Sequence, residues 1–227
     1  MSTTEMTKHI RIIYENTDFL VCEKPKGMLT LPAESEEESL FDLVLTGKAD
    51  GCARAQLFPV HRLDRLTGGL VVFAKTKASA TSLSAIFAEH KNEKEYLCVV
   101  HGRPDEESGE CTDLLLCDKR ANKTYVVDRM RKGVKEARLS YSTLSTLPYK
   151  SGTVSLLRVR LHTGRMHQIR AQLSSRGHAL LGDGKYGSKE NACTVALHAS
   201  ALRFSYKGEH SFSSPAPSEF PFSLFEI

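Results

Sequence analysis

The chain has 227 residues, 41% of them hydrophobic and 26% charged, and a formal net charge of +4. These values are typical of a globular protein and exclude disordered, collagen-like and coiled-coil classes. No apolar run approaches the roughly 18 residues that cross a bilayer, and the start MSTTEMTKHIR has no signal-peptide pattern, so we predict a cytoplasmic protein.

The first part of the chain predicts a hairpin, a buried strand and a helix. Apolar runs on both sides of residues 16–18 predict two antiparallel strands, which a turn at residues 25–27 follows. The continuous apolar run at residues 69–74 predicts a buried strand. Between Lys77 and His90, apolar residues recur at three- and four-residue spacing, which predicts an amphipathic helix.

The rest of the chain predicts mainly strands. These cover residues 96–101, 138–147, 153–162 and 195–206, and a turn at residues 148–152 joins the middle two. The spacing of Met166, Ile169 and Leu173 predicts a helix that ends at Gly177. We therefore predict an α+β fold with a mixed, mainly antiparallel sheet and flanking helices.

The domain organisation indicates one compact body, and the cysteine content indicates an intracellular protein. There is no internal repeat and no long linker, so we predict one domain over residues 1–227 with a motif-bearing core at about residues 10–220. The cysteines include no C-x-x-C pair, which argues against a disulfide framework and a structural zinc site. We expect reduced, mostly buried thiols at Cys22, Cys52, Cys98, Cys111, Cys117 and Cys193.

Positive charge is concentrated in one block. Residues 137–182 contain no Asp or Glu and seven Arg or Lys, so this block carries +7 and leaves −3 for the rest. An arginine-rich block is typical of a surface that binds a polyanion, although a solvated basic face is the alternative. An acidic cluster is expected to face away from such a partner; it comprises Glu34, Glu36, Glu37, Glu38 and Asp42.

Three segments, residues 61–70, 94–96 and 162–170, place polar groups at the ends of apolar elements. In the first, Asp64 lies between Arg62 and Arg65. A nearby guanidinium favours the ionised carboxylate, which suits a nucleophile or an electrostatic stabiliser better than a general acid. A salt-bridged turn residue is the alternative role for Asp64.

The third segment reads as a strand end, a tight turn and a helix start at residues 163–165, where free backbone N–H groups bind anions. His162 and His167 lie five residues apart across this turn with no evident third ligand, so we predict no metal site. By itself, a tyrosine on a strand, such as Tyr96, is most often a half-buried core residue with its hydroxyl on a partner.

Together the segments resemble the RluA family of pseudouridine synthases, the branch that modifies uridines in ribosomal and transfer RNA. HRLDRLTGGLVVFAK resembles the signature H-R-L-D-x-x-T-S-G-L, KEYLCVVHG the tyrosine motif, and LHTGRMHQIRAQL the basic motif. Similarity extends to EKPKGM, GDGKYG and LHA, at residues 23–28, 182–187 and 197–199. Gly68 replaces the usual Ser and Met166 a commonly small polar residue, which we expect to affect substrate fit rather than chemistry.

The resemblance implies isomerisation of uridine to pseudouridine, in which the N1 glycosidic bond breaks and the base rejoins the sugar through C5 without cofactor or metal. It implies Asp64 as the catalytic carboxylate, Arg165 as its partner, and Tyr96 as the residue that stacks on the uracil and helps to remove the C5 proton. Three routes stay open for Asp64: attack on the sugar, attack on the base, or abstraction of a sugar proton.

RNA contacts are expected around these residues. A duplex hides the reacting atoms, so the target must be splayed out, which favours a stem-loop in ribosomal RNA, transfer RNA or both. The resemblance implies that Arg62 fills the gap left by the base. The wider RNA-binding set is His61, Arg158, Arg160, His167, Gln168 and Arg170, and Ile169 and Leu197 are expected in the base pocket, although either also fits plain core. An accessory amino-terminal RNA-binding domain has no room here.

Two other classes remain. A non-catalytic RNA-binding or RNA-folding protein on the same scaffold would bind RNA without forming pseudouridine. A metal-dependent hydrolase using His162 and His167 would lose its activity to a chelator. The sequence names neither the RNA nor the uridine nor the number of sites, and a monomer is the simplest prediction for the oligomeric state.

Overall fold

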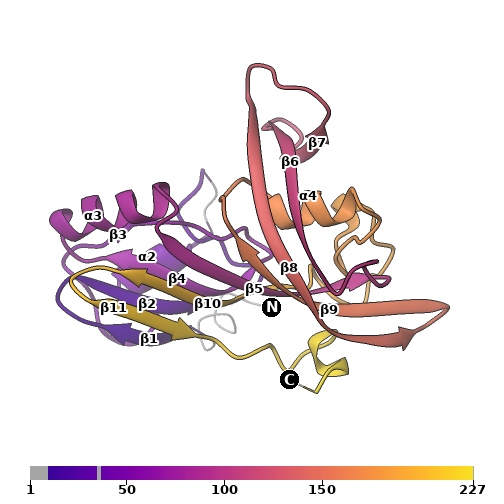
Figure 1. Ribbon diagram of the computed structural model, residues 1–227. Helices are drawn as coiled ribbons and strands as arrows, with labels where there is room; N and C mark the ends of the chain where they lie inside the picture. The colour runs from indigo at the N-terminus through magenta and orange to yellow at the C-terminus, as the bar shows by residue number, and fades with distance from the viewer. Residues whose placement is uncertain (1–9, 35–36, 227) are drawn as a thin grey trace. The chain divides into compact units, whose positions relative to one another are not determined.

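A computed structural model describes residues 10–34 and 37–226, which fall into two compact units (Figure 1). Unit 1 contains the residues up to Asn92 together with Ala199–Ser214, and unit 2 contains Glu93–His198 and the residues from Pro215 onward. Antiparallel strand pairs dominate both units and helices are few, which confirms the predicted α+β class. The single domain over residues 1–227 stays a prediction.

Unit 1 is built on a sheet with the strand order β1-β2-β4-β10. Its strands are β1 (Arg11–Glu15), β2 (Phe19–Lys24), β3 (Phe58–Pro59), β4 (Gly68–Ala74), β10 (Leu197–Ser205) and β11 (Glu209–Ser213). The predicted hairpin is confirmed, because β1 pairs antiparallel with β2. Its turn is closed by the Asn16 side chain, which accepts hydrogen bonds from the backbone N–H groups of Asp18 and Phe19, both at 2.8 Å.

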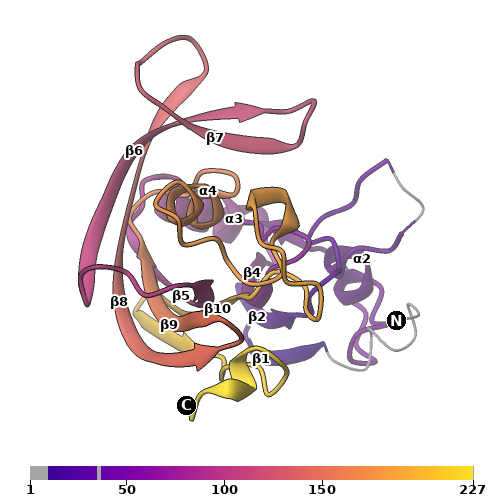
Figure 2. The ribbon, with the colours of Figure 1, turned by 90° about the vertical axis from the view of Figure 1, so that its right-hand side faces the viewer.

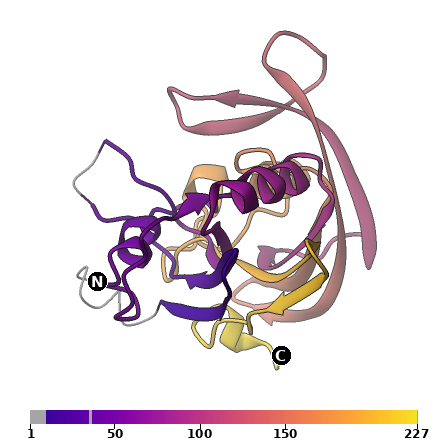
Figure 3. The same ribbon diagram turned by 90° about the vertical axis from the view of Figure 1, so that its left-hand side faces the viewer.

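The apolar run of β4 is buried on both faces, as predicted. On one face Leu70 and Val72 pack with Leu83 of α3 (Lys77–Ala88), and Figure 3 shows this helix running along unit 1. On the other face the ring of Phe73 lies 5.7 Å from that of Phe41 in α2 (Leu40–Leu45). The predicted end of α3 at His90 is slightly late, because the helix ends at Ala88 and His90 has a left-handed φ of 57°.

Unit 2 has the strand order β5-β9-β8-β6-β7. Its elements are β5 (Asn92–His101), β6 (Ser108–Asp118), β7 (Lys123–Val127), β8 (Val134–Tyr149), β9 (Gly152–Leu161), α4 (Gln168–Ser174) and the short 3-10 helices η1 (Gly184–Tyr186) and η2 (Phe222–Leu224). The predicted pair of long strands is confirmed as β8 and β9. Strands β6, β7 and β11 were not predicted. No helix among the described residues combines the length and apolar character needed to cross a bilayer.

Helix α4 lies beside the strands of unit 2 (Figure 2). Its Ala171 lies in a buried cluster with Leu115 of β6, Ala137 of β8 and Tyr186 of η1. A second cluster lies on β5 and β9 and includes Val99, Val154 and Leu156. The helix begins at Gln168, two residues later than the predicted pattern starts, because His167 adopts a left-handed φ of 51°.

Only part of the cysteine burial is as predicted. Cys22, Cys98 and Cys111 are buried, whereas Cys52 and Cys117 are exposed and Cys193 is half-buried. Burial raises the pKa of the Cys22 and Cys98 thiols, so these two remain protonated at neutral pH.

Gly69 is required by both its backbone conformation and its surroundings, and we predict that Gly69→Ala strongly destabilises unit 1. Its φ is +109°, and a Cβ atom there would lie 2.2 Å from the carbonyl oxygen of Ala199. We expect a loss of about 2–4 kcal/mol in the free energy of unfolding, measured by urea denaturation. Gly152→Ala is the control, because nothing lies within 4 Å of its added Cβ. Equal effects of the two substitutions would contradict a specific requirement for glycine at position 69.

Candidate active site

Asp64 lies on a turn directly before β4. The backbone N–H of Thr67 donates to the Asp64 carbonyl at 3.0 Å and closes the turn. Asp64 is half-buried between the buried Leu63 and the exposed Arg65. The carboxylate therefore lies where the chain enters the buried core strand of unit 1.

Both neighbours of Asp64 are held by residues 24–30. On one side, the Thr30 hydroxyl donates to the Leu63 carbonyl at 2.8 Å and accepts from the Leu63 N–H at 3.2 Å. On the other side, the carbonyl of Arg65 accepts from the Gly27 N–H at 2.8 Å and from Lys24 Nζ at 3.1 Å. These bonds fix the backbone on both flanks of the candidate catalytic residue.

Lys24 was not among the predicted site residues, and its only sequence signal was its place in EKPKGM. Its side chain is 1% exposed, and Nζ also donates to the carbonyls of Pro25 at 2.9 Å and Met28 at 2.8 Å. Burial lowers the pKa of Lys24 to about 7, and the negative charge of Asp64 acts in the opposite direction. Lys24 therefore places beside the Asp64 turn an amino group that is only partly protonated at neutral pH.

The acidic cluster reaches this same turn. Glu37 pairs with the guanidinium of Arg65 at 3.0 Å, and Arg65 also donates through Nε to the Gly27 carbonyl at 2.9 Å. Glu37 therefore lies beside the Asp64 turn, and the expectation that the cluster faces away from a polyanionic partner stays a prediction. Glu36 lies outside the described residues.

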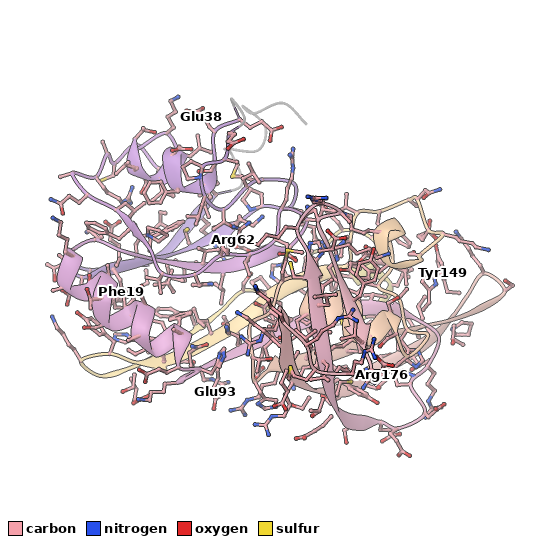
Figure 4. All side chains as sticks on the ribbon, turned by 90° about the horizontal axis from the view of Figure 1, so that it is seen from above. Phe19, Glu38, Arg62, Glu93, Tyr149 and Arg176 are labelled. Carbon is pink, nitrogen blue, oxygen red and sulfur yellow. The ribbon has the colours of Figure 1, made fainter. Side chains whose placement is uncertain are left out.

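His61 and Arg62 differ in their surroundings. The His61 ring stacks on Phe87 at 4.6 Å, and its Nε2 accepts from the Val72 N–H at 3.1 Å, so it helps to join the segment to β4 and α3. Arg62, labelled in Figure 4, is exposed. Contact of either residue with RNA stays a prediction, and exposure favours Arg62.

In unit 2, Tyr96 lies on β5 opposite Val159 of β9 and is 7% exposed. Lys94 precedes it by two residues, so the two side chains share a face of the strand. A Cβ atom added to Gly164 would lie 3.4 Å from Lys94 Nζ, which places the ammonium group against the turn that carries Arg165. Burial lowers the pKa of Lys94, a residue that was not among the predicted site residues.

The turn before α4 is organised by the buried side chain of Gln168. Its Oε1 accepts from the Arg165 N–H at 3.0 Å and from the Thr163 hydroxyl at 2.8 Å, while Nε2 donates to the Arg138 carbonyl at 3.1 Å. Of the backbone N–H groups of residues 163–165 that we expected to be free for an anion, that of Arg165 is therefore taken by Gln168, and that of Thr163 donates to the Arg138 carbonyl at 3.2 Å. The Arg165 side chain donates through Nε to the Glu136 carbonyl at 2.9 Å.

Tyr186, from the GDGKYG segment, connects the basic motif to β7. Its hydroxyl accepts from the Thr124 N–H at 2.8 Å and lies 3.1 Å from Nδ1 of His167. The Arg170 guanidinium lies over its ring at 4.9 Å and pairs with both oxygens of the buried Asp183. Burial of Arg170, 4% exposed, does not favour its predicted contact with an RNA phosphate.

The remaining predicted residues of unit 2 divide by exposure. Arg158 and Arg160 project from the exposed face of β9, and Arg160 pairs with Glu93. Ile169 and Leu197 are buried in α4 and at the start of β10. Both fit the core as well as a base pocket, so their role stays a prediction.

The candidate catalytic residues thus divide between the units, with Asp64 in unit 1 and Tyr96 and Arg165 in unit 2. Within the part of the chain that the structure describes, no group of three or more His, Cys, Asp or Glu side chains is placed to hold a metal ion. Carboxylate, phenol and guanidinium groups all take part in covalent or acid-base catalysis in enzymes, and the catalytic roles of these three residues stay predictions.

Comparison with known proteins identifies the class. The sequence pattern of the RNA pseudouridylate synthase family matches residues 18–175 of this chain. The chain belongs to this family, and it is an RNA pseudouridine synthase, an isomerase that converts uridine in RNA to pseudouridine.

Individual relatives agree with this class. The chain is 31% identical over 211 residues to the dual-specificity RNA pseudouridine synthase RluA of Escherichia coli K12, an alignment that covers 90% of this chain and 92% of that protein. It is 34% identical over 199 residues to ribosomal large subunit pseudouridine synthase D of Zymomonas mobilis, covering 86% of this chain and 61% of that protein. The structure of human RNA pseudouridylate synthase domain containing 1 has the same fold, with a TM-score of 0.77, 24% identity and coverage of 92% and 84% of the two chains.

We predict that Lys24→Met lowers turnover about 10- to 100-fold, because the Arg65 carbonyl loses one of its two donors and the Asp64 turn can shift. The measurement is the rate of pseudouridine formation at saturating RNA. Lys48→Met, at an exposed lysine of the same unit, is the matched control and should retain the wild-type rate. A Lys24→Met enzyme with normal turnover would contradict the positioning role.

The lowered pKa of Lys24 also predicts a pH dependence of stability. Between about pH 7 and the unfolded-state pKa of about 10.4, the unfolded chain binds a proton at Lys24 that the folded chain does not. The stability of the wild type relative to Lys24→Met should therefore rise with pH across this window. Urea unfolding of both proteins at pH 7, 8, 9 and 10 measures the difference, and a difference that stays flat or falls would refute the assignment.

Proposed function

We propose that this enzyme isomerises particular uridines in a stem-loop of ribosomal RNA, transfer RNA or both, and that the ionised carboxylate of Asp64 drives the reaction. The observation that carries the proposal is the double anchoring of the Asp64 turn through Leu63 and Arg65. A reaction that depends on the position of one carboxylate requires a rigid backbone around that side chain. One relative is named for the ribosomal large subunit, which supports ribosomal RNA as a substrate, and another is named for dual specificity, which supports more than one kind of RNA substrate.

In the proposed site, Tyr96 and Arg165 of unit 2 act on the same uridine as Asp64. Arg165 is the proposed partner of Asp64 in this reaction, as the family resemblance implies. The bond from N1 to C1′ breaks, the bond from C5 to C1′ forms, the proton leaves C5 and N1 gains a proton, so the reaction is balanced without a co-reactant. The ring of Tyr96 stacks on the uracil and its hydroxyl assists removal of the C5 proton.

Access to the target requires that the uridine leaves its stack. This step costs a few kcal/mol and is least costly in a loop, which favours a stem-loop over a regular duplex. The exposed Arg62 is suited to occupy the vacated position, because it directly precedes Leu63 and lies two residues before Asp64. The exposed Arg158 and Arg160 are suited to contact phosphates of the same RNA.

We predict that Asp64→Asn abolishes turnover, because the amide is neither a nucleophile nor a base, while RNA binding is preserved. Tritium release from total RNA labelled at C5 of uridine, taken from cells that lack this enzyme, measures the reaction, and filter retention of the same RNA measures binding. Asp105→Asn, at an exposed loop position, is the control and should release tritium at the wild-type rate. Near-normal release by Asp64→Asn would overturn the role of Asp64.

The same assay tests the non-catalytic alternative. An RNA-binding or RNA-folding protein would retain RNA on the filter without any tritium release from the wild type. Nothing in the family match or the relatives supports that alternative. The cytoplasmic location and the monomeric state stay predictions.

A further inference from the structure

Residues 182–192, which we call the support loop, contain two buried polar side chains that the proposed reaction does not use. Ser188 is 7% exposed and Glu190 is 6% exposed. The support loop begins in the GDGKYG segment and lies within unit 2. Burial of polar groups is costly unless they are hydrogen-bonded, so the bonds of these two side chains indicate what they do.

The Ser188 hydroxyl joins two distant positions of the support loop. Its oxygen accepts from the backbone N–H groups of Gly182 and Glu190, both at 3.2 Å. It also lies 2.8 Å from Nε2 of His101, the last residue of β5. One hydroxyl therefore bonds residues 182 and 190 to each other and to the sheet.

These three contacts determine where the protons lie. The Ser188 oxygen has two lone pairs, and both accept from backbone N–H groups, so the hydroxyl proton is donated to Nε2 of His101. Nε2 therefore carries no proton, and the neutral ring has its proton on Nδ1. Protonation of Nε2 would remove the acceptor and break the contact with Ser188.

The surroundings of His101 favour its neutral ring. Burial lowers the pKa of His101, the negative charge of Glu190 acts in the opposite direction, and the positive charge of Lys150 lowers the pKa further. His178 is the other titratable group at this residue, with its Nδ1 3.1 Å from the His101 carbonyl oxygen. His101 is therefore an acceptor for Ser188 at neutral pH.

Glu190 attaches the support loop to the turn between β8 and β9. Its Oε2 accepts from the Tyr149 hydroxyl at 2.6 Å and from Lys150 Nζ at 2.5 Å, and Tyr149 is labelled in Figure 4. Its Oε1 accepts from the N–H groups of Asn191 and Ala192 at 3.0 and 2.9 Å. The bond from Lys150, followed by that from Tyr149, lowers the pKa of Glu190 to about 2. The carboxylate is thus ionised at neutral pH and bridges the two segments.

The support loop carries residues that hold the basic motif. Asp183 pairs with Arg170 of α4. The Tyr186 hydroxyl lies 3.1 Å from Nδ1 of His167, and the Tyr186 carbonyl accepts from the hydroxyl of Ser174 in α4 at 2.6 Å. A displaced support loop would therefore displace α4 and the turn before it.

We propose that Ser188 and Glu190 are positioning residues for the reaction, because they hold the support loop in the arrangement that supports the basic motif, and that this arrangement requires a neutral His101. The inference rests on the proposed role of the turn that carries Arg165. Ser188 and Glu190 act through the support loop rather than on the uridine. Their loss should therefore affect turnover more than RNA affinity.

The first test compares Ser188→Ala and Glu190→Ala with the wild type at pH 7.5. Tritium release from total RNA labelled at C5 of uridine, taken from cells that lack this enzyme, gives kcat and KM, and filter retention of that RNA gives affinity. We expect kcat to fall about 5- to 50-fold in each variant, with KM and affinity changed less than about 2-fold, because the turn shifts while exposed RNA contacts remain.

The matched control is Lys189→Ala, at the exposed position between the two buried residues. This control should keep the wild-type kcat. Wild-type kcat in both Ser188→Ala and Glu190→Ala would overturn the proposal, and so would a loss confined to KM. Thermal unfolding of each variant separates a displaced turn from an unfolded chain. A loss of kcat that only follows the unfolded fraction would show a merely structural role and would also overturn the proposal.

A second test measures the proton on His101 and leaves the support loop unaltered. Nitrogen chemical shifts of the wild type with isotope-labelled histidine report which ring nitrogen is protonated at neutral pH. The His101 signals are assigned by their absence in His101→Gln. We expect the proton on Nδ1, and a proton on Nε2 would overturn the inferred bond from Ser188.

His101→Gln also tests the requirement for a neutral ring, because its amide oxygen can accept from the Ser188 hydroxyl but does not titrate. The ratio of kcat in His101→Gln to kcat in the wild type should rise as the pH falls from 7 to 5, since only the wild type loses its acceptor by protonation. His210→Gln, in unit 1, is the control and should give a constant ratio. A constant ratio for His101→Gln would refute the requirement.

Failure of the proposed function gives a different result. In that case the wild-type chain itself releases no tritium from the labelled RNA. The position of the proton on His101 is measured without RNA, so it still decides whether Ser188 holds the support loop as inferred.

Discussion

The fixed backbone on both sides of Asp64 is the constraint on which the site in unit 1 depends. The anchoring residues Lys24, Gly27 and Thr30 come from a segment about 35 residues earlier in the chain, and their partners are backbone atoms of Leu63 and Arg65. These bonds are made to backbone atoms, so they fix the position of the turn that carries the carboxylate. Turns held in this way give catalytic side chains a defined direction without placing them in a rigid helix.

In unit 2, side chains of the basic motif itself hold the turn that carries Arg165. Gln168 bonds to Thr163, Arg165 and Arg138 and so shapes the turn before α4. Arg170 is buried against Asp183. The basic motif as a whole was predicted to bind RNA. In the structure its buried residues hold the turn, whereas its less buried residues are accessible to a ligand.

The sequence predicted the elements that carry strong local patterns. The hairpin around Asn16, the buried strand β4 and the helix α3 follow from turn residues, an apolar run and helical spacing. Missed features depend on partners distant in sequence, as with the bonds of Lys24 and the pairing of β7 with β6. The resemblance to family motifs identified Asp64, Tyr96 and Arg165 as candidate catalytic residues. No local sequence pattern distinguishes the residues that hold their turns and strands from ordinary polar residues.

Each unit places a buried lysine against the turn that bears its candidate catalytic residue, Lys24 near Asp64 and Lys94 near Arg165. Burial of an ammonium group is costly, and a methionine of similar length would pack without that cost. Lys24 directs its N–H donors to three backbone carbonyls, which fix the chain but do not neutralise the charge. The group therefore supplies what no apolar residue can, because its three donors fix the turn that carries Asp64.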